Sequence, residues 1–224
     1  MTDMGSVVAV VLAAGRSSRS GTQHKLLARD ADGQTMLSRT LAGLCASQVS
    51  ALCVVLPPIK REISASLQKI VQETCAGKRT DIRISTAADE GLSASLKVGI
   101  QWAMEQRAAG CLVSLGDMPL VDGTVIDALV DRFRRGGADV VLPEWQGQVG
   151  NPVLWKAGCF EALLALTGDR GGKALLSEPS LMKAGVTADP SVFTDFDTPD
   201  ALLDFAGLAV AATLCRPPSR PTGL

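Results

Sequence analysis

Two basic side chains in a loop of small residues could bind a phosphorylated ligand. Arg19 and Lys25 follow the apolar run at 7–12, and alanine, glycine and serine fill most of the positions around them. Small residues let the backbone approach a phosphate closely, and two cations would add the positive charge that holds it. A surface loop with ordinary solvated cations is the alternative interpretation.

A single carboxylate follows a second apolar run, at 111–115. Asp117 stands between Gly116 and the turn that Pro119 fixes. A carboxylate at the tip of a buried strand can hold a divalent cation that bridges the phosphates of a ligand. A turn or helix-capping aspartate is the alternative.

Two more carboxylates, Asp195 and Asp197, come shortly before the end of the chain. Thr198 can cap the helix that follows, with Pro199 in its first position, so part of this segment has a purely structural explanation. Capping requires neither aspartate. Because Mg²⁺ usually takes one or two protein carboxylates together with phosphate oxygens, we predict a Mg²⁺ site made by Asp117 with Asp197, or with Asp195 in its place.

The loop after the first apolar run matches neither of the two common nucleotide-binding patterns. It contains no GxGxxG, and no Gly-Lys-Ser/Thr follows at the Walker A spacing. A dehydrogenase and a Walker-type NTPase are therefore disfavoured.

The elements that must position these residues alternate along the chain. Apolar periodicity predicts strands at 7–12, 52–56, 82–84, 111–115 and 138–142, and helices at 35–46, 58–76, 92–108 and 123–135. The first, second and fourth strands are almost continuously apolar, which is typical of parallel strands covered on both faces. This order predicts an α/β fold, a three-layer α/β/α sandwich with a mainly parallel, Rossmann-like sheet. Ligands of such sheets bind outside the carboxyl ends of the strands, where the candidate residues stand.

The pattern is less regular in the last third of the chain. We expect a late strand at 153–155, with an antiparallel direction as one alternative, and helices at 157–166, 171–177 and 199–212. No repeat or long linker divides the chain, which favours a single domain over 1–214 followed by a Pro-rich flexible tail at 215–224.

Composition excludes several classes of protein. The 224 residues carry 22 Lys and Arg against 23 Asp and Glu, with 4% aromatic residues, so neither a nucleic-acid partner nor a charged membrane surface is expected. None of the six cysteines forms a CxxC pair, and several lie in apolar runs, so we expect small buried hydrophobes. With no signal-peptide pattern and no run long enough to span a membrane, the expected location is the cytoplasm.

Six ordered motifs resemble one known family. The loop from Leu12 to Leu27 resembles the signature loop of the MobA-like nucleotidyltransferases, which have the nucleotide-diphospho-sugar transferase fold. The later motifs resemble the molybdenum cofactor cytidylyltransferase (MocA-type) branch; they lie at 91–96, 116–119, 150–154, 168–176 and 195–199. Agreement in order over roughly residues 7 to 205 is far less probable by chance than one match.

The resemblance implies an enzyme that transfers CMP from CTP to the terminal phosphate of molybdopterin and releases pyrophosphate. It implies catalytic roles for Arg19, Lys25 and Asp117, with Mg²⁺ as the cofactor and a molybdenum hydroxylase or its maturation chaperone as a possible partner. Arg19 and Lys25 would neutralise the triphosphate, and Ser95 would help to frame the base and ribose. The nucleotide-binding residues it implies are Leu12, Ala13, Ala14, Gly15, Arg19, Lys25, Ser95 and Gly116.

Base choice and acceptor are also inferred from the family. Ala13 and Ala14 before Gly15 resemble the cytidylyl branch, whereas guanylyl members usually have Ala-Gly-Gly there, and a glycine makes room for a purine. Asn151 replaces the usual His of a Gly-His-Pro motif, so a GTP-using homologue, a nucleotidyltransferase for another phosphorylated metabolite, and a non-catalytic carrier or chaperone of the cofactor stay open. His24 is expected to lie exposed in the loop without a catalytic role.

Overall fold

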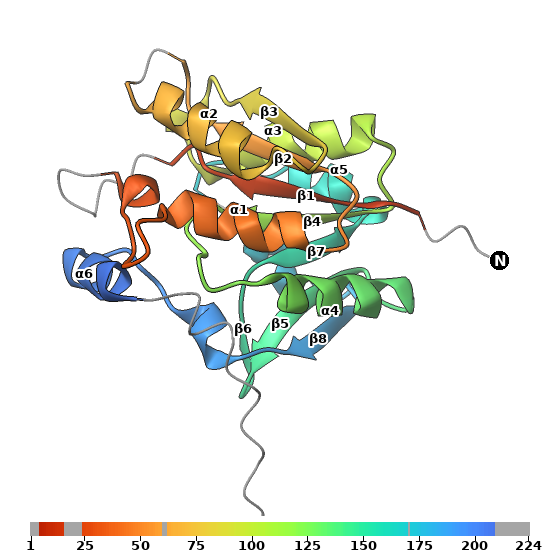
Figure 1. Cartoon of the computed structure of the whole chain (residues 1–224). Coiled ribbons are helices and arrows are strands. Elements are labelled where there is room, and N and C mark those ends of the chain that lie inside the picture. Colours follow the sequence, from red (N-terminus) through yellow and green to blue (C-terminus); the bar gives the residue numbers. More distant parts are fainter. Residues whose placement is uncertain (1–4, 16–23, 60–61, 170, 209–224) are drawn as a thin grey trace, which may run out of the picture.

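An eight-stranded sheet forms the centre of the protein in the computed structural model, which describes residues 5–15, 24–59, 62–169 and 171–208 (Figure 1). The strands run along the sheet in the order β3-β2-β1-β4-β7-β5-β6, and β8 pairs with β5. Their bounds are β1 Val7–Leu12, β2 Leu52–Leu56, β3 Thr80–Ile84, β4 Gly110–Leu115, β5 Val140–Trp145, β6 Gln148–Val149, β7 Val153–Lys156 and β8 Lys183–Thr187. Each of the six predicted strands is present.

The first strand, β1, lies between β2 and β4 and is parallel to both. All of its residues are buried, and successive side chains contribute to two different cores. One core contains Val7, Ala9 and Val11, and the other contains Val8, Val10 and Leu12. This two-sided burial explains the unbroken apolar run and confirms the predicted parallel strands with covered faces.

Helices cover both faces of the sheet. On one side are α1 Met36–Ala46, α2 Ile63–Thr74 and α4 Gly123–Arg134, and on the other are α3 Leu92–Glu105 and α5 Phe160–Leu164 (Figure 1). The last helix, α6 Pro199–Gly207, packs beside the start of α1 through a smaller third core. The predicted three-layer α/β/α sandwich with a mainly parallel sheet is confirmed.

The second half of the sheet is mixed. The late strand β7 is antiparallel to both β4 and β5, as expected. We did not predict β8, which pairs in parallel with β5, or the short β6. Most residues of β8 and both residues of β6 are solvent-accessible, so neither strand has the apolar run that identifies buried strands.

Several predicted bounds were wrong. The helix predicted at 58–76 covers only Ile63–Thr74. The helix predicted at 92–108 ends at Glu105, where Arg107 adopts a left-handed backbone (φ 53°). The segments predicted as helices at 157–166 and 171–177 contain 3₁₀ turns at Ala157–Cys159 and Gly172–Ser177.

The end of the chain differs from the prediction as well. Helix α6 ends at Gly207 rather than 212, and residues 209–212 and the expected tail at 215–224 lie outside the described residues. None of the helices formed by the described residues is long and apolar enough to cross a membrane.

The cysteines that the structure describes contribute to packing. Four of them are buried and Cys45 is half-buried, and these five form no disulfide with one another. Burial raises the pKa of the Cys53 thiol to about 12, so it stays protonated near neutral pH. These five cysteines fit the expectation of small hydrophobes, while Cys215 lies outside the described residues.

Candidate active site

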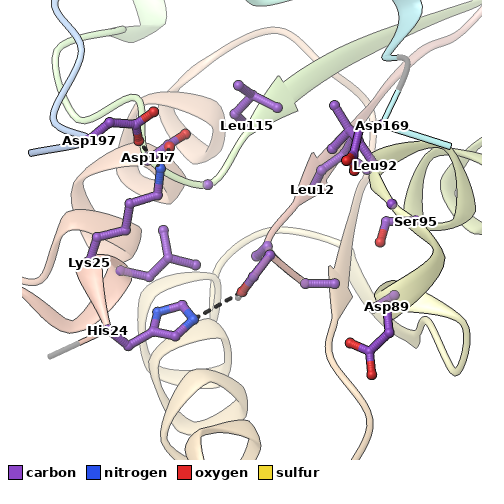
Figure 2. A pocket seen from close by; sticks show the side chains of 17 residues that line it. Leu12, His24, Lys25, Asp89, Leu92, Ser95, Leu115, Asp117, Asp169 and Asp197 are labelled. Atoms are coloured by element: carbon purple, nitrogen blue, oxygen red, sulfur yellow. Dashed lines mark hydrogen bonds and ion pairs between the residues drawn. The ribbon is translucent and has the colours of Figure 1, made fainter. Parts of the chain in front are cut away.

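A cavity of about 590 Å³ opens at the carboxyl ends of β1 and β4, beside the start of α3 (Figure 2). This is the edge at which a mainly parallel sheet binds its ligands. The predicted residues that line it are Leu12, Ala13, Ala14, Gly15, Lys25, Ser95, Gly116, Asp117 and Asp197. Arg19 lies outside the described residues.

The backbone that follows β1 stays attached to the sheet. The Ala13 N–H donates to the Val55 carbonyl (2.9 Å), and the Gly116 N–H donates to the Leu12 carbonyl (3.0 Å). A Cβ on Gly116 would come within 3.2 Å of the Ala13 Cβ and 3.3 Å of a Leu26 methyl group. Glycine at this position therefore allows the segments that carry Ala13, Lys25 and Asp117 to pack closely.

His24 lies at the cavity, a position that the sequence analysis did not predict. The half-buried imidazole lines the cavity, and its Nε2 donates to the Gly15 carbonyl oxygen (3.1 Å; Figure 2). A carbonyl oxygen only accepts, so the bond requires the proton on Nε2. This contact joins the two ends of the segment 16–23, which lies outside the described residues.

Lys25 is the cation at the charged end of the cavity. It begins a 3₁₀ turn, Lys25–Leu27, that is anchored by the buried Leu26. Its ammonium donates to carboxylate oxygens of both Asp117 and Asp197 (Figure 2), and the three side chains are 19%, 17% and 32% exposed. Burial by itself lowers the pKa of the ammonium, but the charges of Asp117 and Asp197 and the hydrogen bonds to them hold it above its ordinary value.

Asp117 is positioned by a buried threonine that the sequence analysis missed. The Thr40 hydroxyl, on α1, accepts from the Met118 N–H (3.1 Å) and shares its own proton between the carbonyls of Gly116 (3.0 Å) and Met36 (3.1 Å). It therefore holds the peptide groups on both sides of Asp117. A threonine inside a helix has no sequence pattern that points to such a contact.

Asp197 is positioned by the residues beside it. Phe196 is buried, and its ring packs edge-on against that of Phe205, with centroids 5.4 Å apart. Thr198 caps α6 by accepting from the Ala201 N–H (3.2 Å), as predicted. Of the two aspartates considered, Asp197 contacts Lys25, and Asp195 is not among the described residues that line the cavity.

The charges of this cluster also act on the carboxyl of Asp195. Partial burial, followed by the charge of Asp197, raises the pKa of its carboxyl. Asp195 therefore interacts electrostatically with the site without lining the cavity.

The opposite end of the cavity is formed at the start of α3. Gly91 has φ +110°, and a Cβ on it would come within 2.5 Å of the Gly168 backbone. The Ser93 N–H donates to the Gly168 carbonyl (3.1 Å), so this loop is held against α3. Ser95, from the next turn, is 4% exposed and lines the cavity, and no described residue hydrogen-bonds its hydroxyl.

The sequence analysis gave no role to several further lining residues. These are His24, Leu26, Ala88, Asp89, Gly91, Leu92, Leu115 and Asp169. Asp169 and Gly91 stand in motifs already noted, so a signal for them existed. No sequence pattern pointed to Asp89, because its position depends on the path of the connection from β3 to α3 across the edge of the sheet.

The donor set at the charged end suits a divalent cation. One oxygen from each of Asp117 and Asp197 binds the same Lys25 Nζ, so both carboxylates can reach one positive centre. Carboxylate oxygens are the ligands that Mg²⁺ prefers, and it seldom takes more than two of them at a phosphate site. These two aspartates would hold the metal.

Comparison with protein families identifies the chain. The model of the MobA-like NTP transferase domain matches residues 9–184, which run from the third residue of β1 to the start of β8 and include most of the cavity. The chain belongs to the MobA-like NTP transferase family. This confirms the predicted family and makes the chain a nucleotidyltransferase by membership, in a family that typically depends on a divalent metal.

Two curated relatives of this MobA-like NTP transferase domain differ in their described roles. Purine catabolism protein PucB of Bacillus subtilis is 29% identical over 87% of this chain and 93% of its own length. A probable molybdenum cofactor guanylyltransferase of Methanosarcina acetivorans is 30% identical over 62% of this chain and 57% of its own length.

Solved structures share the fold of this MobA-like NTP transferase domain. Rv0371c from Mycobacterium tuberculosis is 25% identical, with a TM-score of 0.71 over 89% of this chain and 97% of that one. A second structure of Rv0371c is a complex with manganese, at 23% identity and a TM-score of 0.69 over 90% of this chain and 98% of that one. The nucleotide-diphospho-sugar transferase fold expected from the sequence is therefore confirmed.

Proposed function

We propose that the protein transfers CMP from CTP to the terminal phosphate of molybdopterin and releases pyrophosphate. One observation carries the proposal: a loop of small residues, one lysine and two carboxylates converge on a single cavity, whose other end presents the neutral groups of Ala14 and Ser95 beside Asp89 and Asp169. A nucleoside triphosphate has the matching asymmetry, with a charged tail and a base that needs shape and hydrogen bonds.

The reaction needs positioning and charge neutralisation more than a protein nucleophile. An oxygen of the acceptor phosphate attacks the α-phosphorus of CTP, the bond between the α-phosphorus and the bridging oxygen breaks, and pyrophosphate leaves. The acceptor phosphate is ionised at neutral pH, so no side chain has to remove a proton from it.

In the proposal the chain's own residues hold the reacting groups. Lys25 would neutralise the triphosphate at the α-phosphate, and Arg19 would join it from the preceding loop. Asp117 and Asp197 would hold Mg²⁺, which when bound lowers the negative charge that the attacking phosphate meets. The backbone from Ala13 to Gly15 would contact the base and phosphates.

CTP is the proposed donor because of the methyl groups beside Gly15. Ala13 and Ala14 line the cavity, and they stand where guanylyl members of the family usually have the glycines that make room for a purine. Ser95 offers an unpaired hydroxyl, among the described residues, for the base or ribose. The M. acetivorans relative is described as a probable guanylyltransferase, so GTP is the competitor to test first.

The acceptor and setting complete the proposal. The family resemblance favours molybdopterin as acceptor, and a molybdenum hydroxylase or its maturation chaperone as the recipient of the product. We place the reaction in the cytoplasm.

A pyrophosphate-release assay tests the proposal. Purified protein is incubated with molybdopterin, Mg²⁺ and each of the four nucleoside triphosphates in turn, and we expect the fastest release with CTP. Preference for GTP would overturn the choice of base, and release only with another phosphorylated acceptor would overturn molybdopterin. Tight binding of the cofactor without any release would favour a carrier instead of an enzyme.

A further inference from the structure

Lys25 occupies the point at which a divalent ion would have to bind. Its ammonium bridges Asp117 and Asp197, the two carboxylates that fit the metal. The three side chains are largely withdrawn from water, so this contact is less screened than a surface ion pair. The candidate metal site is therefore filled by a cation of the chain itself.

A metal and the lysine exclude each other there. Two positive centres that contact the same pair of carboxylates would repel strongly at that distance. A metal arriving alone must therefore displace Lys25 from two ion pairs. A triphosphate removes this obstacle, because it offers the ammonium a new anionic partner.

The ammonium group of Lys25 can move while the backbone of this residue stays fixed. The Ala28 N–H donates to the Lys25 carbonyl (3.0 Å), the Leu27 N–H donates to the His24 carbonyl (2.9 Å), and Leu26 is buried. The four-carbon stem beyond Cα is flexible and lines the open cavity. The ammonium can therefore reach a new partner in the cavity without rearrangement of the fold.

We propose that Lys25 holds the metal position closed until the nucleotide binds, and that its ammonium then transfers to the triphosphate and frees Asp117 and Asp197 for the metal. This inference rests on the proposed function, since it requires a triphosphate in this cavity. It makes metal binding depend on nucleotide binding, and it gives Lys25 a role before the chemical step.

Direct binding of Mn²⁺ to nucleotide-free protein tests the first half. We compare the unchanged protein with Lys25→Met and Lys25→Gln, and Lys69→Met serves as the control because Lys69 is an exposed lysine of α2 paired only to Glu73 among the described residues. Calorimetry and the paramagnetic signal of free Mn²⁺ should show that both Lys25 variants bind at least about tenfold more tightly than the unchanged protein. Lys69→Met should not differ from it, and adding Asp117→Asn to Lys25→Met should abolish the gain.

Nucleotide binding without metal tests the second half. With EDTA present, CTP should bind the unchanged protein, and Lys25→Met should weaken that binding about tenfold, because the ammonium is its proposed phosphate partner. Lys25→Gln, which keeps most of the length of the side chain, separates loss of charge from loss of packing. Circular dichroism and thermal unfolding of each variant verify that it folds.

Two results would overturn the inference. One is equal Mn²⁺ affinity of the unchanged protein and both Lys25 variants in the absence of nucleotide. The other is unchanged CTP binding by Lys25→Met in EDTA. If the proposed function alone is wrong, the Lys25 variants would still gain Mn²⁺ affinity, but no nucleoside triphosphate would yield pyrophosphate.

Discussion

At one end of the cavity Lys25, Asp117 and Asp197 meet as charged side chains, whereas at the other end Ala14 and Ser95 present a methyl group and a hydroxyl beside two separate carboxylates, Asp89 and Asp169. The charged end is assembled from three separate segments. The neutral groups of Ala14 and Ser95, here called the neutral end, come from the segment after β1 and the first turns of α3, which pack directly on the sheet.

The difference indicates that the two ends of the cavity have different functions. Charge interactions are strong and depend little on the identity of the base, so the charged end should control the rate of transfer. Methyl groups and single neutral hydrogen bonds distinguish ligands by shape and by modest energies, so the neutral end should control which nucleotide is used. Substitutions at the two ends should therefore affect different kinetic constants.

Asp117→Asn should have the largest effect. It removes the charge that would hold the metal while keeping the size of the side chain, and we expect kcat to fall about 10³-fold. Steady-state pyrophosphate release measures this, with Asp131→Asn, an exposed residue of α4, as the control. Retained activity would remove Asp117 from the metal site.

Thr40→Val tests whether the charged end depends on a buried neutral contact. The Met118 N–H and the Gly116 carbonyl would both lose their hydroxyl partner, at a cost of about 1–3 kcal/mol in the free energy of unfolding. We expect kcat to fall about tenfold with KM for CTP little changed, because Asp117 would be held less accurately.

Rescue distinguishes positioning from bulk stability. Thr40→Ser keeps the hydroxyl and should restore most of kcat, even if the lost methyl group lowers the melting temperature. A Thr40→Val protein with lower stability but undiminished kcat would show that Thr40 supports the fold only.

Ala14→Gly should shift base preference at the neutral end. Removing the methyl group makes room for a purine, and we expect the ratio of kcat/KM for GTP to that for CTP to rise about tenfold. Initial rates with both nucleotides give the ratio. If CTP and GTP change in parallel, Ala14 does not select the base.

Ser95→Ala should have the smallest effect. Loss of one neutral hydrogen bond to the nucleotide should raise KM for CTP about three- to tenfold with kcat nearly constant. Because the described residues give this hydroxyl no partner, melting temperature should hardly change. A fall in kcat instead of a rise in KM would mean that the two ends of the cavity do not act separately.

Most of the fold was predictable because its central strands are buried on both faces. Continuous apolar runs identified β1, β2 and β4. The strands β6 and β8 were missed for the opposite reason, since their accessible positions tolerate polar residues. Helix bounds were least predictable where 3₁₀ turns replace α-helix, as at Gly172–Ser177.

Site residues were predictable where a strand ends in an unusual local pattern. Asp117 and the loop at 12–15 were found because small residues and a carboxylate directly follow apolar runs. Thr40 was not found, because its role comes from a contact 76 residues away in the chain. The place of His24 at the cavity was not predicted, because its bond joins it to Gly15, nine positions away in the chain.

The sequence by itself determined that a parallel sheet would present small residues, cations and carboxylates at the carboxyl ends of its strands, because hydrophobic periodicity and turn residues act locally. Only the tertiary structure decided which of them meet. Lys25 is separated from Asp117 by 92 residues and from Asp197 by 172. Of the two aspartates beside the buried Phe196, it is Asp197 that contacts the lysine, and only the tertiary structure shows which of them does, because they are two residues apart in the same segment.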